Sequence, residues 1–377
     1  GNGLVDMYAN FGMLAKAEQV LKELPVRNIV TWSALIAGYV EHGECHNAIR
    51  FFEQMQCEGF SPDSITYIYI LKACGNTKNI EKGEQVHYEV VQRGFLEKDI
   101  VLGNALIDMF IKCAMLTKAQ EVLDKLPIRD AISWNELILG YAQCGQCLKA
   151  LNCFEQMQSE GVSPDSVTYI GILKACGTMR AIKRGEQIHG ELIGTSLLNK
   201  SVPLGNTLLD MYIKCGILAK AQQVLDELPI RNTSTWNALI SGYAQQGKCH
   251  GTLTSFEHMQ NEGLSPNEVT FVSMFTACGS VGSVERGKRV HLLLLHGGHF
   301  QCNKSRLRSL NMKNNPRNLD VKNNINVGNA IVDMYSKCGA MQKAYEVFEK
   351  LLERNVVTWG ALIAGYVQHG LYHEALK

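Results

Sequence analysis

Residues 30–39 read VTWSALIAGY, and close copies return as ISWNELILGY (132–141), STWNALISGY (234–243) and VTWGALIAGY (357–366). The first three copies lie 102 residues apart, and the fourth follows after a further 123. A fixed period of this kind is the sequence signature of a repeat architecture, in which each unit packs on its neighbours. The period therefore decides the fold class before any single residue is considered.

The 102-residue period divides into three similar repeats of 35, 36 and 31 residues. In the repeat 29–63, apolar residues recur three and four positions apart on two successive stretches, which is the pattern of two amphipathic helices. One hairpin of this size cannot bury both apolar faces, whereas stacked neighbours can. We therefore predict an all-α fold, an α-solenoid superhelix of stacked helix-turn-helix repeats.

A hydroxyl residue precedes most of the first apolar stripes, and we predict that it is the N-cap of its helix. The 31-residue repeats have Leu102, Leu204 and Val327 there instead, so their sequence marks the helix start less sharply. The predicted caps are Thr31, Thr66, Ser133, Thr168, Thr235, Thr270 and Thr358.

Eleven repeats can be counted, of which the first and the last are shortened, so we expect the sequence to be a piece of a longer protein with any targeting peptide outside it. The tandem repeats of 1–296 are followed by a basic insert at 297–324 and by further repeats at 325–377. The insert is rich in Asn, Lys and Arg and has no helical stripe, which predicts a disordered loop, although an error in the gene model explains it equally well. The predicted intervals are 1–28, 29–63, 64–99, 100–130, 131–165, 166–201, 202–232, 233–267, 268–324 (its repeat part ending at 296), 325–355 and 356–377.

The composition excludes several classes of protein. Hydrophobic residues make up 46% of the chain and charged residues 19%, and the formal net charge is +1, which excludes a polybasic arm and a disordered acidic chain. No apolar stretch approaches the roughly 20 residues needed to span a membrane, so we expect no membrane partner. Thirteen cysteines, an odd number in a long chain, indicate a reducing compartment rather than a disulfide framework.

The repeat sequence distinguishes two families of helical pairs. The tetratricopeptide pattern requires Gly after Trp-x2-Leu, but Ile36 follows Leu35 here. VTWSALIAGYVEHGECHNAIRFFEQMQCEGFSPD (30–63) instead closely resembles the pentatricopeptide repeat. GNALIDMFIKC (103–113) resembles the S type and ILKACG (70–75) with GEQVH (83–87) the L type of the plant subclass with alternating P, L and S repeats.

The resemblance covers the chain outside the insert, and it implies an organellar protein that binds single-stranded RNA by sequence. It further implies a role in RNA processing or modification, often C-to-U RNA editing, with editing-complex proteins as partners. We expect a mitochondrion in preference to a chloroplast. The alternative hypothesis is a protein-interaction scaffold without RNA binding, because α-solenoid grooves also bind peptides.

Base reading requires a short polar side chain at one position of every repeat. The fifth and last residues of the 31- and 35-residue repeats meet this requirement, and the resemblance implies that they choose the base. Caps near helix starts are a second explanation for the same residues. The pairs are Asn2 with Asn28, Ser33 with Asp63, Asn104 with Asp130, Asn135 with Asp165, Asn206 with Asn232, Asn237 with Asn267, and Asn329 with Asn355.

The resemblance implies that Asn with Asp favours uracil, Asn with Asn a pyrimidine, and Ser with Asp guanine. From 5′ to 3′ the predicted RNA is pyrimidine, G, any, U, U, any, pyrimidine, pyrimidine, any, pyrimidine. The "any" positions belong to the 36-residue repeats, whose fifth residues Ile68, Ile170 and Val272 cannot hydrogen-bond a base. Gly360 leaves the last repeat without a reading residue.

Two further sets of residues complete the predicted interface. The second residue of a repeat would wedge between bases, and Pro203, Ser234 and Asn326 depart from the aliphatic pattern there. The predicted wedge residues are Val30, Val101, Ile132 and Val357. Lys112, Lys214 and Lys337 share one position in the 31-residue repeats and are candidate phosphate contacts.

The net charge restricts how RNA would be held. The insert carries six basic residues and one acid, so the remainder has 31 basic and 35 acidic residues, a net charge of −4. A slightly acidic array cannot bind chiefly by neutralising phosphates. We therefore expect stacking and base-edge hydrogen bonds to supply the affinity.

Fragments of a zinc deaminase motif occur, but the set is incomplete. His87 and His189 each begin an H-x-E triplet, and Cys144 and Cys147 form a C-x-x-C that lacks the preceding Pro. His87, His189 and Cys147 also recur with the repeat, which is the simpler explanation for them. We predict no enzyme activity, cofactor or metal in this chain, with any deaminase module beyond Lys377 or in another protein.

Overall fold

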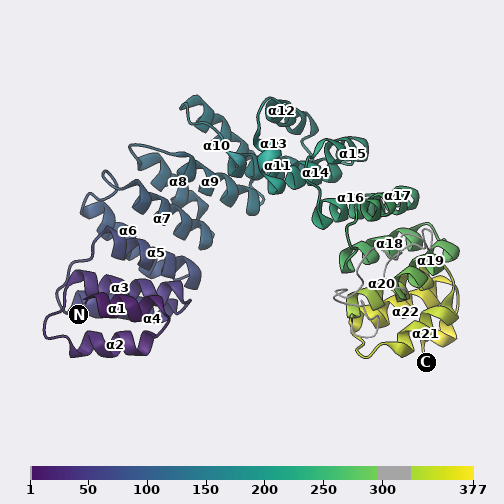
Figure 1. Ribbon diagram of the computed structural model, residues 1–377, viewed down its shortest axis with the longest axis horizontal. Helices are drawn as coiled ribbons and strands as arrows, with labels where there is room; N and C mark the ends of the chain where they lie inside the picture. The colour runs from purple at the N-terminus through teal and green to yellow at the C-terminus, as the bar shows by residue number, and fades with distance from the viewer. Residues whose placement is uncertain (1, 296–323) are drawn as a thin grey trace. The chain divides into compact units, whose positions relative to one another are not determined.

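The computed structural model describes residues 2–295 and 324–377, and these residues contain 23 α-helices and no β-strand (Figure 1). This confirms the predicted all-α fold. The helices belong to two compact parts, Gly1–Met179 and Arg180–Lys377. The N-terminal part contains α1 (Asn2–Asn10), α2 (Leu14–Glu23), α3 (Ile29–Glu41), α4 (Cys45–Cys57), α5 (Ser64–Thr77), α6 (Ile80–Gln92), α7 (Ile100–Lys112), α8 (Leu116–Lys125), α9 (Ala131–Gln143), α10 (Cys147–Ser159) and α11 (Ser166–Met179).

The C-terminal part also consists of alternating first and second helices of successive repeats. Its one addition within the described residues is a single turn of helix, α13. The elements are α12 (Ile182–Ile193), α13 (Leu197–Lys200), α14 (Val202–Lys214), α15 (Leu218–Glu227), α16 (Thr233–Gln245), α17 (Cys249–Asn261), α18 (Glu268–Ser280), α19 (Val284–Leu295), α20 (Ile325–Lys337), α21 (Met341–Lys350), α22 (Val356–Gln368) and α23 (Tyr372–Ala375).

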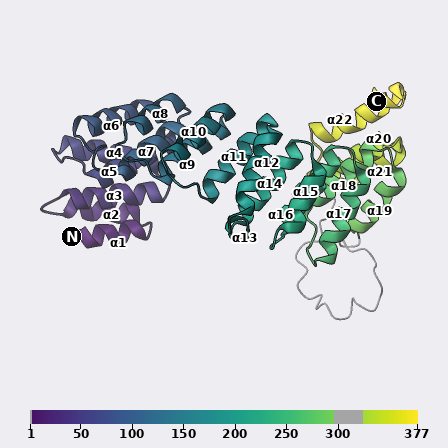
Figure 2. The same cartoon turned by 90° about the horizontal axis from the view of Figure 1, so that it is seen from above.

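The first helix of each predicted repeat from residue 29 onward begins on the first residue of its interval. Within each part these first helices pack against one another in chain order, and the second helices pack against them (Figure 2). Each part is therefore an α-solenoid segment. The first helices are α1, α3, α5, α7, α9 and α11 in the N-terminal part, and α14, α16, α18, α20 and α22 in the C-terminal part.

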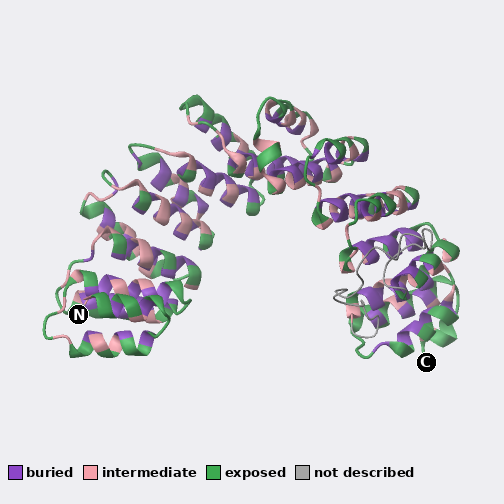
Figure 3. Ribbon diagram, viewed as in Figure 1, coloured by how far each residue is buried: buried purple, intermediate pink, exposed green. Residues whose placement is uncertain are grey.

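The periodic apolar residues form the core of the stack. Trp32, Trp134 and Trp236 are at most 2% exposed, and buried residues lie on the helix faces that meet their neighbours (Figure 3). The equivalent Trp359 on α22, the last full-length helix, is 49% exposed. In this sequence α22 is followed only by the short helix α23, so burial of the tryptophan depends on the helices that follow it, as expected for stacked repeats.

A glycine on the first helix sets how closely neighbouring repeats approach. A Cβ atom added to Gly38 would lie 2.6 Å from the Cβ atom of Ala9, on the first helix of the preceding repeat. Gly140, Gly242 and Gly365 occupy the same position in later repeats, and an added Cβ would come within 3.0 Å of a side chain of the preceding repeat at each. The missing side chain lets successive first helices pack closely, which keeps equivalent residues of adjacent repeats at a regular spacing.

We predict that Gly38→Ala destabilises the chain by about 1–2 kcal/mol, because the methyl group overpacks against Ala9. Gly190→Ala is the matched control, since Gly190 lies inside α12 with no atom within 4 Å of an added Cβ. It should stabilise the chain by about 0.5–1 kcal/mol through helix propensity. Urea unfolding followed by circular dichroism measures both, and equal effects of the two substitutions would refute the packing constraint.

Candidate nucleic-acid interface

The last residue of each repeat is the N-cap of the next repeat's first helix. The backbone of Asn28 is extended, and its Oδ1 accepts a hydrogen bond of 3.0 Å from the backbone N–H of Thr31. Asp63, Asp130, Asp165, Asn232, Asn267 and Asn355 accept the same bond at 2.8–3.2 Å. The residues predicted to bind bases thus also start helices, as the cap explanation proposed.

The prediction that Thr31 and its equivalents are the N-caps is wrong, because they lie at the third position inside the helix. A short carboxylate or amide at the true cap reaches the third N–H. In α16, α18 and α22 the third-position hydroxyl accepts from the backbone N–H of the cap, which completes a capping box. The 31-residue repeats also start cleanly, capped by Asp99, Ser201 and Asn324.

The same hydroxyl connects the fifth and last residues of the preceding repeat. The Oγ1 atom of Thr168 donates to Oδ1 of Asn135 at 2.6 Å and lies 3.1 Å from Oδ1 of Asp165. Five other Asn residues accept this bond from the following repeat at 2.5–2.8 Å: Asn2, Asn104, Asn206, Asn237 and Asn329. At the remaining pair the two hydroxyls of Ser33 and Thr66 lie 2.5 Å apart.

The amide nitrogen of the fifth residue turns toward the last residue. Nδ2 of Asn135 donates to the two carboxylate oxygens of Asp165 at 3.0 and 3.1 Å, and Nδ2 of Asn237 donates to Oδ1 of Asn267 at 2.8 Å. A carboxylate only accepts hydrogen bonds, so the nitrogen and not the oxygen must face it. The nitrogens of Asn104 and Asn329 make the same contact at 3.4 and 3.3 Å, so the amide has a defined orientation at four of the seven predicted pairs.

Hydrogen bonds lower the pKa of Asp130, the last residue of one pair. Partial burial acts to raise the pKa of Asp130, but the bonds from the backbone and hydroxyl of Ser133 and from Asn104 outweigh it and lower that pKa. Asp130 is therefore an acceptor at neutral pH.

The two members of a pair differ in depth. Ser33, Asn135, Asn237 and Asn329 are buried, at 6–9% exposure, and Asn2, Asn104 and Asn206 are half-buried, whereas the last residues are half-buried or exposed. In the four pairs with a buried fifth residue, that residue is recessed behind the rim that the last residue forms.

The second residues carry apolar side chains into solvent beside these pairs. The four predicted wedge residues, Val30, Val101, Ile132 and Val357, are 57–62% exposed. The 36-residue repeats carry exposed aliphatic residues at the same position, and these were not among the predicted wedge residues, because the fifth residues of these repeats cannot hydrogen-bond a base. The exposed aliphatic residues are Ile65, Val167 and Val269.

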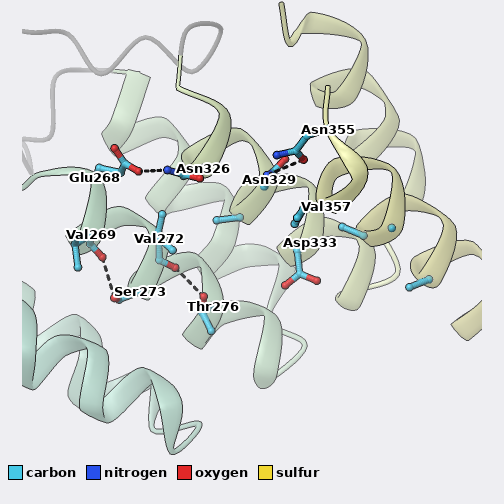
Figure 4. A pocket seen from close by; sticks show the side chains of 14 residues that line it. Glu268, Val269, Val272, Ser273, Thr276, Asn326, Asn329, Asp333, Asn355 and Val357 are labelled. Atoms are coloured by element: carbon cyan, nitrogen blue, oxygen red, sulfur yellow. Dashed lines mark hydrogen bonds between the residues drawn. The ribbon is translucent and has the colours of Figure 1, made fainter. Parts of the chain in front are cut away.

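In the C-terminal part these positions line one groove of about 810 Å³ over α18, α20 and α22 (Figure 4). Three successive repeats contribute the same two positions to its wall. Asn326 Nδ2 donates to the carboxylate of Glu268 at 2.6 Å, which places a polar pair at one end of the groove. The second residues are Val269, Asn326 and Val357, the fifth are Val272, Asn329 and Gly360, and Asn355 is the last residue of its repeat.

The predicted phosphate contacts already have anionic neighbours. The Nζ atoms of Lys112, Lys214 and Lys337 lie 2.7–2.8 Å from carboxylates four residues earlier on the same helix. These ion pairs are partly exposed and therefore weak, so contact with phosphate stays a prediction.

The histidines of the incomplete deaminase motif are half-buried and pack against aromatic residues of the core. His87 packs edge-on to Phe110, with 5.3 Å between ring centroids, and Nδ1 of His189 lies 2.9 Å from the hydroxyl of Tyr212. Within residues 2–295 and 324–377, no three His, Cys, Asp or Glu side chains are grouped so as to hold a metal. Cys144 is exposed whereas Cys147 is buried.

Two sequence-based predictions concern the chain outside this interface. The insert 297–324 lies outside the described residues apart from Asn324, the cap of α20. Among the described helices, none has both the length and the apolar character of a membrane span.

Comparison with known families and structures identifies the repeat. A model of the PPR repeat family matches residues 27–76, 129–178 and 231–280, and a PPR repeat model matches 2–29, 329–356 and 357–377, together more than half of the chain. The chain belongs to the pentatricopeptide repeat (PPR) family. The family assignment confirms the resemblance seen in the repeat sequence.

Arabidopsis thaliana has many PPR relatives of this chain. Three are the pentatricopeptide repeat-containing proteins At5g27110 (32% identical), At2g03380, mitochondrial (31%), and At4g18520, chloroplastic (32%). All three matches cover 100% of this chain but only 51–57% of the relative. The chain thus spans about half the length of the relatives it matches.

Solved PPR structures share the fold. PPR10 in complex with an 18-nt psaJ RNA element matches with a TM-score of 0.77 and 18% identity, over 99% of this chain and 53% of PPR10. PPR10 from maize gives a TM-score of 0.58, also at 18% identity, over 100% of this chain and 62% of that one. At this identity the likeness concerns the fold alone.

The half-buried histidines of the PPR repeats predict a loss of stability in mild acid. Partial burial lowers the pKa of His87, His189 and His291 below the ordinary 6.5. As pH falls below about 6.5, the unfolded chain therefore binds protons that the folded chain does not, and the free energy of unfolding decreases. Urea unfolding between pH 7.5 and 5 measures this slope, and His87→Phe should make it shallower.

His46→Gln is the control for the histidine prediction, because His46 is exposed. It should leave the slope as in the parent chain. A His87→Phe variant with an unaltered slope would show that the half-buried histidines do not cause the acid sensitivity.

Proposed function

We propose that this PPR chain binds single-stranded RNA by sequence, with one nucleotide facing each repeat. The observation that carries the proposal is a recurrent hydrogen bond across the repeat boundary. The third-position hydroxyl of the following repeat donates to the fifth-residue oxygen at six Asn residues, and at the seventh pair the hydroxyls of Ser33 and Thr66 are in contact. A peptide groove has no need of the same small amide at each step. A strand of nucleotides, which has a constant backbone and variable bases, matches this regularity.

The polar atoms of each pair correspond to particular base edges. An amide nitrogen has two hydrogens, and the contact with the last residue uses one, so the second is available to a base. An Asn–Asp pair offers this donor beside a carboxylate acceptor, which matches the O4 and N3–H of uracil. An Asn–Asn pair offers two donors, which match the acceptors at N3 and O2 of a cytosine. At Ser33 and Asp63 the carboxylate can accept from N1–H and N2–H of guanine.

The exposed aliphatic residues supply the second contribution to affinity. Val30, Val101 and Ile132 each place branched carbon atoms beside a pair, where they can cover the face of a base. The 36-residue repeats keep the aliphatic residue at the second position but have Ile68, Ile170 or Val272 at the fifth. These repeats would bind a nucleotide without discriminating between bases.

The proposed setting is an organelle, and the proposed role is to direct RNA editing or another step of RNA processing. Support comes from relatives whose names include mitochondrial and chloroplastic. The mitochondrion is the location to test first. The chain would supply recognition, and a deaminase module outside this sequence, or a separate editing protein, would supply the chemistry.

Asp130→Asn and Asp165→Asn should each shift the preference at one nucleotide from uracil toward cytosine. The substitution replaces an acceptor by a donor at the rim, while an Asn still caps the helix, so the fold is kept. We expect the U-over-C affinity ratio to fall by about tenfold, equal to about 1.4 kcal/mol. Binding titrations with RNAs that differ only at that nucleotide provide the measurement.

Asp99→Asn is the matched control for the aspartate variants. Asp99 also caps a helix at the end of a repeat, but the fifth residue of that repeat is Ile68. The control should leave base preference as in the parent chain. Unchanged preference in Asp130→Asn and Asp165→Asn would show that these aspartates do not read bases.

Salt should weaken RNA binding only slightly. Outside 297–324 the chain has a net charge of −4, and the candidate phosphate lysines are paired with carboxylates. For single strands the slope of log affinity against log salt is about −0.7 per phosphate neutralised, so we expect a slope of about −2 or shallower. A steep slope together with equal affinity for a scrambled RNA would contradict base-edge recognition.

A further inference from the structure

We propose that the hydroxyl at the third position of a repeat sets the base preference of the repeat before it. The inference rests on the proposed function and adds a positioning residue to it. The seven hydroxyls are fully buried, at 0% exposure, so they cannot touch RNA themselves and must act through the fifth–last pair. They are Thr31, Thr66, Ser133, Thr168, Thr235, Thr270 and Thr358.

Whether a repeat has a hydroxyl at its third position depends on whether the fifth residue of the preceding repeat is polar. Each of the seven polar fifth residues is followed by a hydroxyl at the next third position. The three apolar fifth residues Ile68, Ile170 and Val272 are followed by apolar third residues instead, namely Leu102, Leu204 and Val327. The two positions thus change together across a repeat boundary.

Starting a helix does not explain this pattern. Asp99, Ser201 and Asn324 cap α7, α14 and α20 through their side chains without a hydroxyl at the third position. A capping box would serve those helices as well as any other. The hydroxyl is present only where a polar fifth residue lies opposite, so that residue is its partner.

The hydrogen bonds form a directed chain. The backbone N–H of Asp165 donates to Oγ1 of Thr168 at 3.0 Å, and the hydroxyl proton then points to Oδ1 of Asn135 at 2.6 Å. The same chain runs through Thr235, Thr270 and Thr358. A hydroxyl has a single proton. The last residue's Oδ1 also lies within reach at 3.0–3.2 Å, but the contact with the fifth residue's oxygen is shorter, at 2.5–2.7 Å, and is the favoured one.

The contact with the Thr168 hydroxyl holds the amide of Asn135 in one orientation. Its oxygen faces Thr168 and its nitrogen faces Asp165, so the edge that remains for a base is a donor. Without the hydroxyl, the contact with Asp165 alone orients the amide, and the amide oxygen has no partner. The amide then rotates more freely, and rotation exchanges donor and acceptor, which is the difference between the edges of uracil and cytosine.

Thr168→Val tests the inference, because valine has nearly the shape of threonine and lacks the hydroxyl. We expect the U-over-C affinity ratio at the nucleotide facing 131–165 to fall about three- to tenfold, the value of one hydrogen bond. The ratio at the nucleotide facing 100–130 should be unchanged, and Thr168→Ser should restore the first ratio. Titrations with RNAs that differ at one nucleotide measure all of these.

Leu102→Thr is the reciprocal control. It places a hydroxyl opposite Ile68, which has no polar atom to orient, so base preference should not change at any nucleotide. Ser133→Ala repeats the test on the other Asn–Asp pair, Asn104 with Asp130, so the inference remains testable if Thr168→Val fails to fold. Circular dichroism of each variant establishes that it is folded.

Three outcomes count against the inference, and they separate it from the proposed function. A parent chain without U-over-C preference at this nucleotide overturns the proposed function and the inference with it. A parent chain with preference and a folded Thr168→Val with the same ratio overturns the inference alone. So does a variant that loses affinity equally for both RNAs, because an equal loss indicates a purely structural role.

Discussion

The hydrogen bond from the last side chain of a repeat to the third N–H of the next helix is the interaction on which the interface depends. It is an ordinary N-cap bond, typically worth about 1 kcal/mol. Because the bond commits one oxygen of the cap, it also determines which atoms of that side chain remain for a ligand. At Asn267, for example, Oδ1 accepts from both Thr270 and Asn237, which leaves the amide nitrogen at the rim. The hydrogen bond that starts the helix therefore also determines which polar atom of the last residue stays exposed.

Close packing of the first helices places the fifth–last pairs of successive repeats at a regular spacing. Gly38 meets Ala9 without an intervening side chain, and the same approach recurs at Gly140 and Gly242. A larger residue would separate neighbouring first helices and lengthen the bond from the third hydroxyl to the preceding fifth residue. Two repeats are therefore needed to build a fifth–last pair, because the hydroxyl residue that orients the pair belongs to the following repeat.

The near-neutral charge is consistent with recognition of this kind. Several basic residues within the repeats form ion pairs with carboxylates, as Lys112 does with Asp108 and Arg27 with Glu58. Polar groups that are held in place by hydrogen bonds lose little conformational entropy when a ligand binds. Small contributions of this kind, summed over many repeats, can replace the attraction between lysine and phosphate.

The sequence by itself determined the repeat period, the all-α fold, the PPR family and the positions of the fifth–last pairs. The period and the two amphipathic stretches per repeat predict an α-solenoid, whereas the family and the fifth–last pairs rest on the resemblance of the repeat sequence to the pentatricopeptide repeat. Only the tertiary structure decided what each polar residue contacts. The structure shows that the N-cap is Asn28 and not the predicted Thr31, because whether a side chain reaches an N–H depends on the backbone geometry. It also gave Thr168 a partner 33 residues away, across a repeat boundary, and no local pattern contains that distance.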